Sequence, residues 1–161
     1  MHIALIAMSG VRAANPELNA VGLTMPGFVE RSKVIASLPS LSLLTLAGMT
    51  PDRIDVSYHE VADLRQLDQL PQCDVAAIAS FSAQIKDAYE LSDRYRTLGV
   101  RTVLGGLHVT ARPDEAAQHA DAVVIGEGEI GWPMLLADLE AGRLKERYAT
   151  DGRNFRLADA P

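Results

Sequence analysis

Short apolar runs, separated by more polar segments, set the pattern of this chain. Residues 3–8, 75–79, 102–104 and 122–125 are apolar almost throughout and rich in Ala, Val, Ile and Leu. Runs of this length without polar alternation are typical of parallel strands that helices cover on both faces. Residues 54–58 instead alternate Ile, Val and Tyr with Asp and Ser. That alternation predicts an edge strand with one wetter face.

Segments with helical spacing of apolar residues separate these runs. Residues 39–48 carry a wide leucine stripe, and residues 83–98 and 129–141 place apolar residues three or four positions apart. Gly99 and Gly142 follow the two longer helices, where glycine commonly ends a helix. One further short helix is expected between the last two strands. The alternation predicts an α/β fold, a three-layer, doubly wound (Rossmann or flavodoxin-like), five-stranded parallel sheet of order 2-1-3-4-5.

Two segments do not follow either period. Residues 9–39 form a long irregular stretch that begins at the carboxyl end of the first strand, so we expect it to line or cover a site there. From residue 143 the hydrophobic periodicity is lost, and Asp151-Gly152 is a turn signal. We therefore predict one domain over residues 1–142 and a linker or short hairpin over residues 143–161.

Composition narrows the function classes. The net charge of −6 argues against unassisted binding to nucleic acid or to an anionic membrane surface. The opening apolar run is too short for a secretory core or a membrane span. Cys73 is the single cysteine of the 161 residues, which excludes an internal disulfide and a cysteine metal cluster. We expect a reducing, cytoplasmic setting.

Candidate binding residues follow the predicted strands. Gly105 and Gly106 end the fourth strand, and Gly126 and Gly128 flank Glu127 after the fifth. Glycines at strand ends expose backbone against which a large ligand can lie. In an open parallel sheet, ligands bind at the carboxyl ends of the strands. The sequence therefore predicts a cofactor cradle at this edge.

Longer motifs around these glycines carry a family resemblance. They read Leu-Gly-Gly-Leu-His-Val-Thr over residues 104–110, Pro-Asp-Glu over 113–115 and Asp-Ala-Val-Val-Ile-Gly-Glu-Gly-Glu over 121–129, with Ile-Ala-Ser at 78–80 and Leu-Pro-Ser-Leu at 38–41. Together they resemble the amino-terminal cobalamin-binding domain of radical S-adenosylmethionine (radical SAM) proteins, often labelled Fe-S oxidoreductases. The resemblance implies cobalamin as cofactor, bound over the strand ends. The residues expected to contact it are Ser9, Gly10, Ser80, Phe81, Ser82, Gly105, Gly106, His108, Gly126, Glu127 and Gly128.

Two departures from related patterns qualify what the resemblance implies. The Asp-x-His-x-x-Gly motif, whose histidine ligates cobalt in cobalamin mutases and methionine synthase, is absent. No residue is therefore predicted to ligate the metal. The Cys-x-x-x-Cys-x-x-Cys cluster motif is absent as well, so an iron–sulfur cluster and S-adenosylmethionine would belong to a missing radical SAM domain, joined in cis or acting in trans. No catalysis is expected from this domain alone.

Several of these residues also have a purely structural interpretation. Ser82 is expected to cap the following helix, which leaves Ser80 as the serine that contacts the ligand. Glu129 is expected to stabilise the dipole of the last helix. For His108, packing at the cofactor edge is favoured over ligation or catalysis.

Other functions remain to be weighed. The chain is either a cobalamin-binding module or a degenerate, cofactor-free scaffold, and in the second case a second copy of the chain is an expected partner. A phospho-receiver would need acidic residues where Ser9-Gly10 and Ser80 stand, and a dinucleotide-binding domain would need Gly-x-Gly-x-x-Gly after the first strand. Both are set aside.

Overall fold

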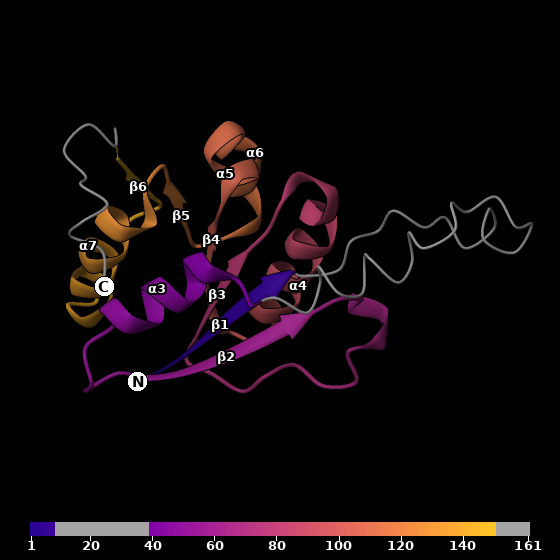
Figure 1. Cartoon of the computed structure of the whole chain (residues 1–161), viewed down its shortest axis with the longest axis horizontal. Helices are drawn as coiled ribbons and strands as arrows, with labels where there is room; N and C mark the ends of the chain where they lie inside the picture. The colour runs from indigo at the N-terminus through magenta and orange to yellow at the C-terminus, as the bar shows by residue number, and fades with distance from the viewer. Residues whose placement is uncertain (9–38, 151–161) are drawn as a thin grey trace, which may run out of the picture.

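A fully parallel sheet forms the centre of the molecule. The computed structural model describes residues 1–8 and 39–150, and Figure 1 shows the sheet with helices on either side. The strands lie in the order β2-β1-β3-β4-β5-β6. Their bounds are β1 (His2–Met8), β2 (Asp55–Val61), β3 (Val75–Ala79), β4 (Arg101–Gly105), β5 (Ala122–Ile125) and β6 (Arg147–Ala149).

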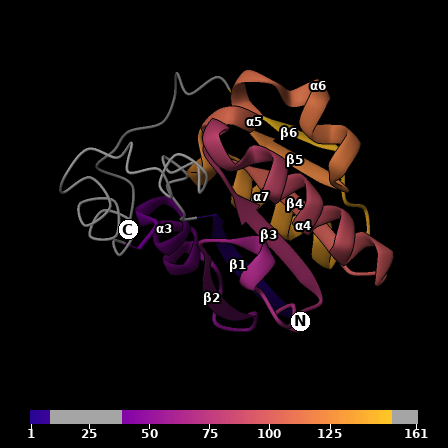
Figure 2. The same ribbon diagram turned by 90° about the vertical axis from the view of Figure 1, so that its right-hand side faces the viewer.

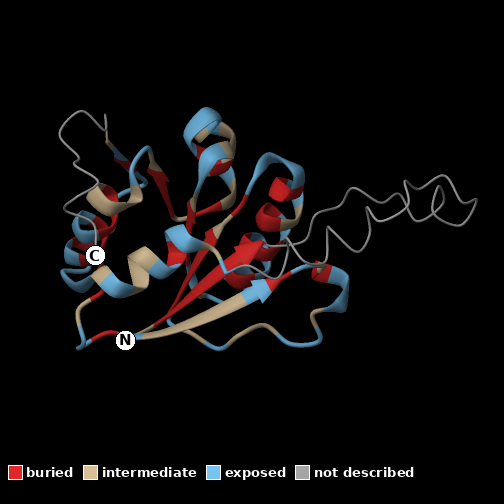
Figure 3. Cartoon of the chain, in the orientation of Figure 1, coloured by how far each residue is buried: buried red, intermediate tan, exposed pale blue. Residues whose placement is uncertain are grey.

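The predicted α/β class and the order of the first five strands are confirmed. β2 is an edge strand, and its residues are mostly half-buried rather than fully buried, as its alternating pattern predicted. The apolar runs that were predicted as central strands are buried almost completely in β1, β3 and β4. Figure 3 shows this buried material concentrated in the strands.

The sheet has one strand more than the five that were predicted. β6 lies within the segment expected to be a linker or hairpin, and it pairs parallel with β5, so that part of the segment is not a hairpin. The amide of Val123 donates to the carbonyl of Glu146, and the amide of Thr150 donates to that of Ile125. A strand of three residues with one buried side chain, Tyr148, leaves no alternation that the sequence could reveal.

Helices cover both faces of the sheet. The helices are α3 (Leu41–Met49), α4 (Ile85–Thr97), α5 (Leu107–Ala111), α6 (Pro113–Ala116) and α7 (Gly128–Glu140), with short 3₁₀ turns η1 (Leu64–Gln66), η2 (Ser82–Gln84) and η3 (Ala117–His119). Residues of α4, α5 and α6 share one buried cluster with one face of the strands. Residues of α3 and α7 share a second cluster with the other face. α4 and α7 accordingly lie on opposite sides of the strands (Figure 2).

The core is mainly aliphatic, and Trp132 is the largest of its fully buried side chains among the described residues. Trp132 of α7 is 1% exposed, and its indole N–H donates to the hydroxyl of Thr50 at 2.9 Å. Thr50 is the residue that ends α3. The bond therefore joins the two helices on this face of the sheet. Among residues 1–8 and 39–150, no helix combines the length and the apolar character that crossing a bilayer requires.

Candidate cofactor-binding edge of the sheet

The predicted site residues gather at one edge of the sheet. β3, β4 and β5 are neighbours and run parallel, so their carboxyl ends meet at the same rim. Gly105 is the last residue of β4, and the predicted site residues that follow the three strands are Ser80, Phe81, Ser82, Gly106, His108, Gly126, Glu127 and Gly128. Ser9 and Gly10 lie outside the described residues. We call this edge the carboxyl rim.

Contacts within the chain's own backbone require a glycine at position 106. Its φ is 108°, and a Cβ there would lie 2.8 Å from the carbonyl oxygen of Ser80. Any side chain would therefore be strained and would also collide with the β3 loop. The contact with Ser80 is sufficient to explain this glycine, and the predicted approach of the cofactor to it stays a prediction.

At Gly126, too, contacts within the chain require a glycine. Its φ is 86°, and a Cβ would lie 2.6 Å from the carbonyl oxygen of Thr150. Its amide donates to the hydroxyl of Thr110 at 3.1 Å, and the amide of Glu127 donates to the hydroxyl of Thr150 at 2.9 Å. These two amides are already satisfied, so they are not free donors for a ligand.

Gly105 differs, because nothing crowds it. A Cβ at this position would meet one atom within 4 Å, the Cβ of Val124 at 3.9 Å, which is an ordinary contact. Gly105 pairs with Ala79, and Ala79 pairs with Ala7. These three small residues form a row across the ends of β1, β3 and β4. Because Ala7 and Ala79 pack with the α3 and α7 cluster, the row lies on that face of the sheet, and we call it the small-residue shelf.

Large apolar side chains are exposed close to this rim. Phe81 follows β3 and is 63% exposed, and Leu107 follows β4 and is 71% exposed. Leu41 and Leu44, at the start of α3, are also exposed. α3 leads into β2 and belongs to the crossover from β1, so it begins on the carboxyl side of the sheet. These four exposed apolar side chains therefore lie on segments at the carboxyl side of the sheet.

Of the two roles predicted for the serines after β3, the cap at Ser82 is wrong, and the ligand contact of Ser80 stays a prediction. The hydroxyl of Ser80, a buried residue, donates to the carbonyl of Phe81 at 2.9 Å. The prediction that Ser82 caps the next helix is wrong. Ser82 is the first residue of η2, α4 begins after Gln84, and neither start has a side-chain cap. The hydroxyl of Ser82 instead lies 2.9 Å from Nδ1 of His108.

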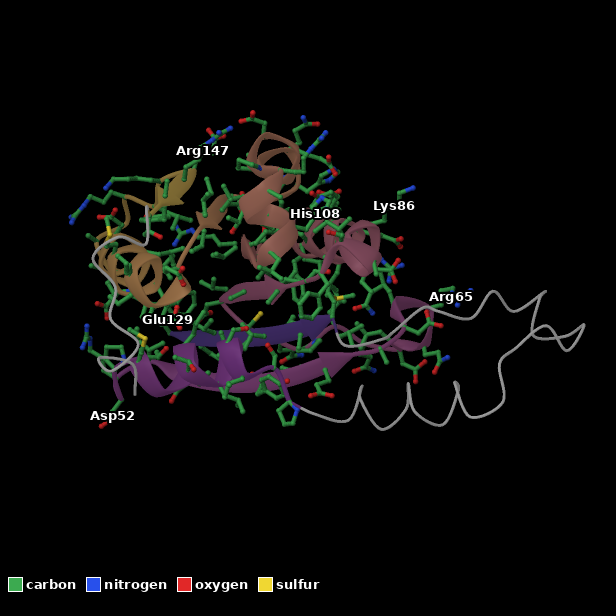
Figure 4. All side chains as sticks on the ribbon, turned by 45° about the horizontal axis from the view of Figure 1, so that its top comes forward. Asp52, Arg65, Lys86, His108, Glu129 and Arg147 are labelled. Carbon is green, nitrogen blue, oxygen red and sulfur yellow. The ribbon has the colours of Figure 1, made fainter. Side chains whose placement is uncertain are left out.

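His108 lies in a small polar cluster between α4, α5 and α6 (Figure 4). Its Nε2 is 3.6 Å from a carboxylate oxygen of Glu115, and its ring meets the ring of Tyr89 edge-on at 6.4 Å. Burial, and to a lesser degree the nearby Glu115 carboxylate, raises the pKa of Tyr89 to about 12, so this phenol is neutral at physiological pH. The prediction that His108 packs beside the rim agrees with these contacts. In the described part of the chain, no group of three or more His, Cys, Asp or Glu side chains could hold a metal ion.

The start of α7 contains the last predicted residues. Glu127 precedes the helix without capping it, and Glu129 lies in its first turn, where a carboxylate stabilises the helix dipole. A Cβ on Gly128 would lie 3.4 Å from a methyl carbon of Leu46. Gly128 therefore lets α7 approach α3 closely beside the shelf.

Sequence reasoning missed three contributors to this edge. Thr150 went unnoticed because it follows a strand that the sequence does not reveal. Ala7 and Ala79 were read only as core residues, because their place in one row depends on strand register. Register between parallel strands is fixed by the whole sheet and is not visible in a local pattern.

Comparisons with known proteins show a matching family and several similar proteins. A family model described as the B12-binding domain matches residues 32–136. A bacteriochlorophyllide d C-8(2)-methyltransferase of Chlorobaculum tepidum is 36% identical over 120 residues, which cover 71% of this chain and 25% of that protein. The C-12(1)-methyltransferase of the same organism is 35% identical over 70% of the chain and 25% of its own length. An uncharacterised methyltransferase of Pyrococcus horikoshii is 29% identical over 65% of the chain and 26% of its length.

Proposed function

Because the chain belongs to the B12-binding domain family, we propose that it is the cobalamin-binding module of a methyltransferase-type enzyme. The chain spans about a quarter of the curated relatives it matches, and their names describe methyltransferases. The reaction of any larger protein, including its substrate, is part of this proposal.

The observation that supports it most directly is the small-residue shelf. Cobalamin carries a nucleotide tail that ends in a flat aromatic base. A flat base needs a surface without protruding side chains. The half-buried Ala79 and Gly105 supply one, next to the buried Ala7 and on the side of α3 and α7. Gly105 contributes most to this surface. A Cβ there would meet one atom within 4 Å, so a large side chain at this position would occupy the space proposed for the base.

Two exposed apolar residues could pack against the corrin ring of the cofactor. Phe81 and Leu107 follow neighbouring strands at the carboxyl rim and would exclude water from the edge of a corrin ring. The hydroxyl of Ser80 has acceptor capacity left, because it uses its one proton on the carbonyl of Phe81. Bound cobalamin would supply the cobalt centre that carries a methyl group, and the protein would supply position and environment.

We propose that no histidine of this edge ligates the lower face of cobalt. The Asp-x-His-x-x-Gly motif is absent. Among the described residues, His108 is the histidine of the rim, and it faces Ser82 and Glu115 rather than open space. With its own base on the small-residue shelf and no histidine in its place, bound cobalamin would have the visible spectrum of a form in which neither its base nor an imidazole ligates cobalt. A spectrum typical of imidazole ligation would contradict this.

We further propose a radical SAM domain as partner, in cis or in trans. An iron–sulfur cluster and S-adenosylmethionine would belong to that domain. The exposed Phe81 and Leu107 support this, because they follow β3 and β4 at the carboxyl rim where cobalamin would present its cobalt, and Leu41 is exposed at the start of α3. A partner seated there would cover them together with the upper face of the ring.

A cofactor-free scaffold is the second candidate, and one observation favours it. At Gly106 and Gly126 the chain's own Ser80 and Thr150 already occupy the space. The two candidates separate in a simple experiment. The purified chain is mixed with hydroxocobalamin, passed over a desalting column and followed by its visible spectrum. Coelution in a near-equimolar ratio supports the module, and no coelution at micromolar protein supports the scaffold.

A further inference from the structure

α5 is a helix of five residues whose polar side chains reach two different loops. Nδ1 of His108 bonds the hydroxyl of Ser82 in the loop after β3 at 2.9 Å. The hydroxyl of Thr110 accepts the amide of Gly126 in the loop after β5 at 3.1 Å. α5 itself follows β4. One short helix therefore ties together the loops of three adjacent strands at the carboxyl rim.

The helix has its own anchor in the core. Val109, between the two polar residues, is fully buried in the cluster beneath α4. This leaves His108 and Thr110 on the sides of α5 that face the neighbouring loops. The buried Val109 anchors α5 independently of the two bonds, which connect the helix to the neighbouring loops.

Ser82 is the hydrogen-bond partner of the imidazole among the described residues. The carboxylate of Glu115 lies 3.6 Å from Nε2, too far for a hydrogen bond, and this buried nitrogen has no other partner in the described part of the chain. Nδ1 and the Ser82 hydroxyl share one hydrogen bond, and which of them donates depends on the tautomer. The ring of Tyr89 packs edge-on against the imidazole.

We propose that His108 and Thr110 are positioning residues for the cofactor, which they hold indirectly by fixing the loops that carry Ser80, Phe81 and Glu127. The inference rests on the proposed cobalamin function and deepens it. Neither side chain needs to touch the cofactor. Without their bonds the loops after β3 and β5 each lose their side-chain tie to α5, and a rigid ligand then has to order them further when it binds.

The test compares substitutions that remove one bond with substitutions that keep it. His108→Ala and Thr110→Val remove the bonds. His108→Asn keeps a polar atom near the position of Nδ1, and Thr110→Ser keeps the hydroxyl. His119→Ala is the matched control, because His119 also packs on Tyr89, stacked at 4.3 Å, but bonds Asp93 rather than a loop of the rim.

Two measurements are made on each variant. The first is the dissociation constant for hydroxocobalamin, which should rise about tenfold for His108→Ala and for Thr110→Val, the effect expected of one lost hydrogen bond. The conservative variants and His119→Ala should bind like the wild type. The second is amide hydrogen exchange without cofactor. It should quicken at Gly126 in Thr110→Val and at Gln84 in His108→Ala.

The outcomes separate this inference from the function it rests on. If the wild-type chain does not bind cobalamin, the proposed function fails, while the exchange data still show whether α5 fixes the loops. Unchanged exchange at Gly126 and Gln84 overturns the inference whatever the cofactor result. Loss of affinity in His119→Ala equal to that in His108→Ala would also overturn it, since packing on Tyr89 would then be the cause.

Discussion

Gly105 and Gly106 are adjacent in the chain, but the structure gives them different reasons for being glycine. Gly106 has a positive φ and abuts the carbonyl of Ser80, whereas Gly105 is extended strand with free space beside it. The sequence showed a glycine pair at a strand end and correctly placed it at the carboxyl rim. It could not show which glycine serves the fold and which leaves room, because that depends on what the β3 loop and Val124 place nearby.

The two alanine variants should therefore differ in stability. Gly106→Ala combines a left-handed backbone with a collision, and we expect it to lower the free energy of unfolding by about 1–3 kcal/mol. Gly105→Ala places a methyl group in ordinary contact with Val124 and should cost about 1 kcal/mol or less. Urea unfolding of both variants checks this. Equal losses would mean that the β3 loop does not crowd Gly106.

At the scale of elements, the long helices and the short apolar strands were predicted well, whereas the three-residue strand β6 and the role of Ser82 were not. α4 and α7 appear where helical spacing placed them. β6 was missed because three residues carry no period, and Ser82 was assigned a capping role because serine commonly caps helices. In this chain the hydroxyl finds His108 from another element instead, a contact 26 residues away that no local pattern contains.

The contact between α3 and α7 allows a matched test. The hydroxyl of Thr50 donates to the carbonyl of Leu46 at 2.7 Å and accepts the indole N–H of Trp132 in a buried site. Thr50→Val would leave both groups without a partner, and we expect a loss of about 1–3 kcal/mol. Thr97 is the control, since its hydroxyl also donates to a carbonyl four residues earlier, at 2.7 Å, but is exposed.

Thermal and urea unfolding compare the two valine variants. Thr97→Val should stay within about 0.5 kcal/mol of the wild type, because surface substitutions seldom cost more. If Thr50→Val were as stable as Thr97→Val, the bond to Trp132 would contribute nothing to joining the two helices.

At the scale of the whole molecule, the topology followed from the alternation of strands and helices, while the sixth strand also contacts a charge cluster. Asp138 at the end of α7 meets Arg143 at 2.8 Å and Lys145 at 2.9 Å, and its side chain is 8% exposed. The hydroxyl of Tyr148 in β6 also donates to it, at 3.3 Å. These residues lie where hydrophobic periodicity ends, so their convergence was not visible in the sequence.

This cluster predicts a pH dependence of stability. The bond from Lys145, together with the charges of Lys145 and Arg143, lowers the pKa of Asp138 in the folded chain. A depressed folded pKa contributes stability that is present above the unfolded value of about 4 and is lost as the pH falls through the folded value. Urea midpoints of the wild type and Asp138→Asn should therefore differ at pH 7 and converge in acid.

A surface pair serves as the control for that titration. Asp114 pairs with Arg147 at 2.6 Å, but its side chain is 86% exposed, and exposed pairs contribute little. Asp114→Asn should follow the wild type throughout the pH range. A constant difference between the wild type and Asp138→Asn down to pH 2 would contradict the assigned role of the Asp138 carboxylate.

The small-residue shelf is the feature on which the functional account depends, and one comparison tests it most directly. Gly105→Leu fills the shelf, while Ala137→Leu adds the same side chain at an exposed position of α7. Hydroxocobalamin binding is measured by equilibrium dialysis for both variants and the wild type, with circular dichroism to establish that each is folded. The account predicts that Gly105→Leu loses binding by at least about a hundredfold while Ala137→Leu binds like the wild type. A folded Gly105→Leu that retains wild-type affinity would contradict it.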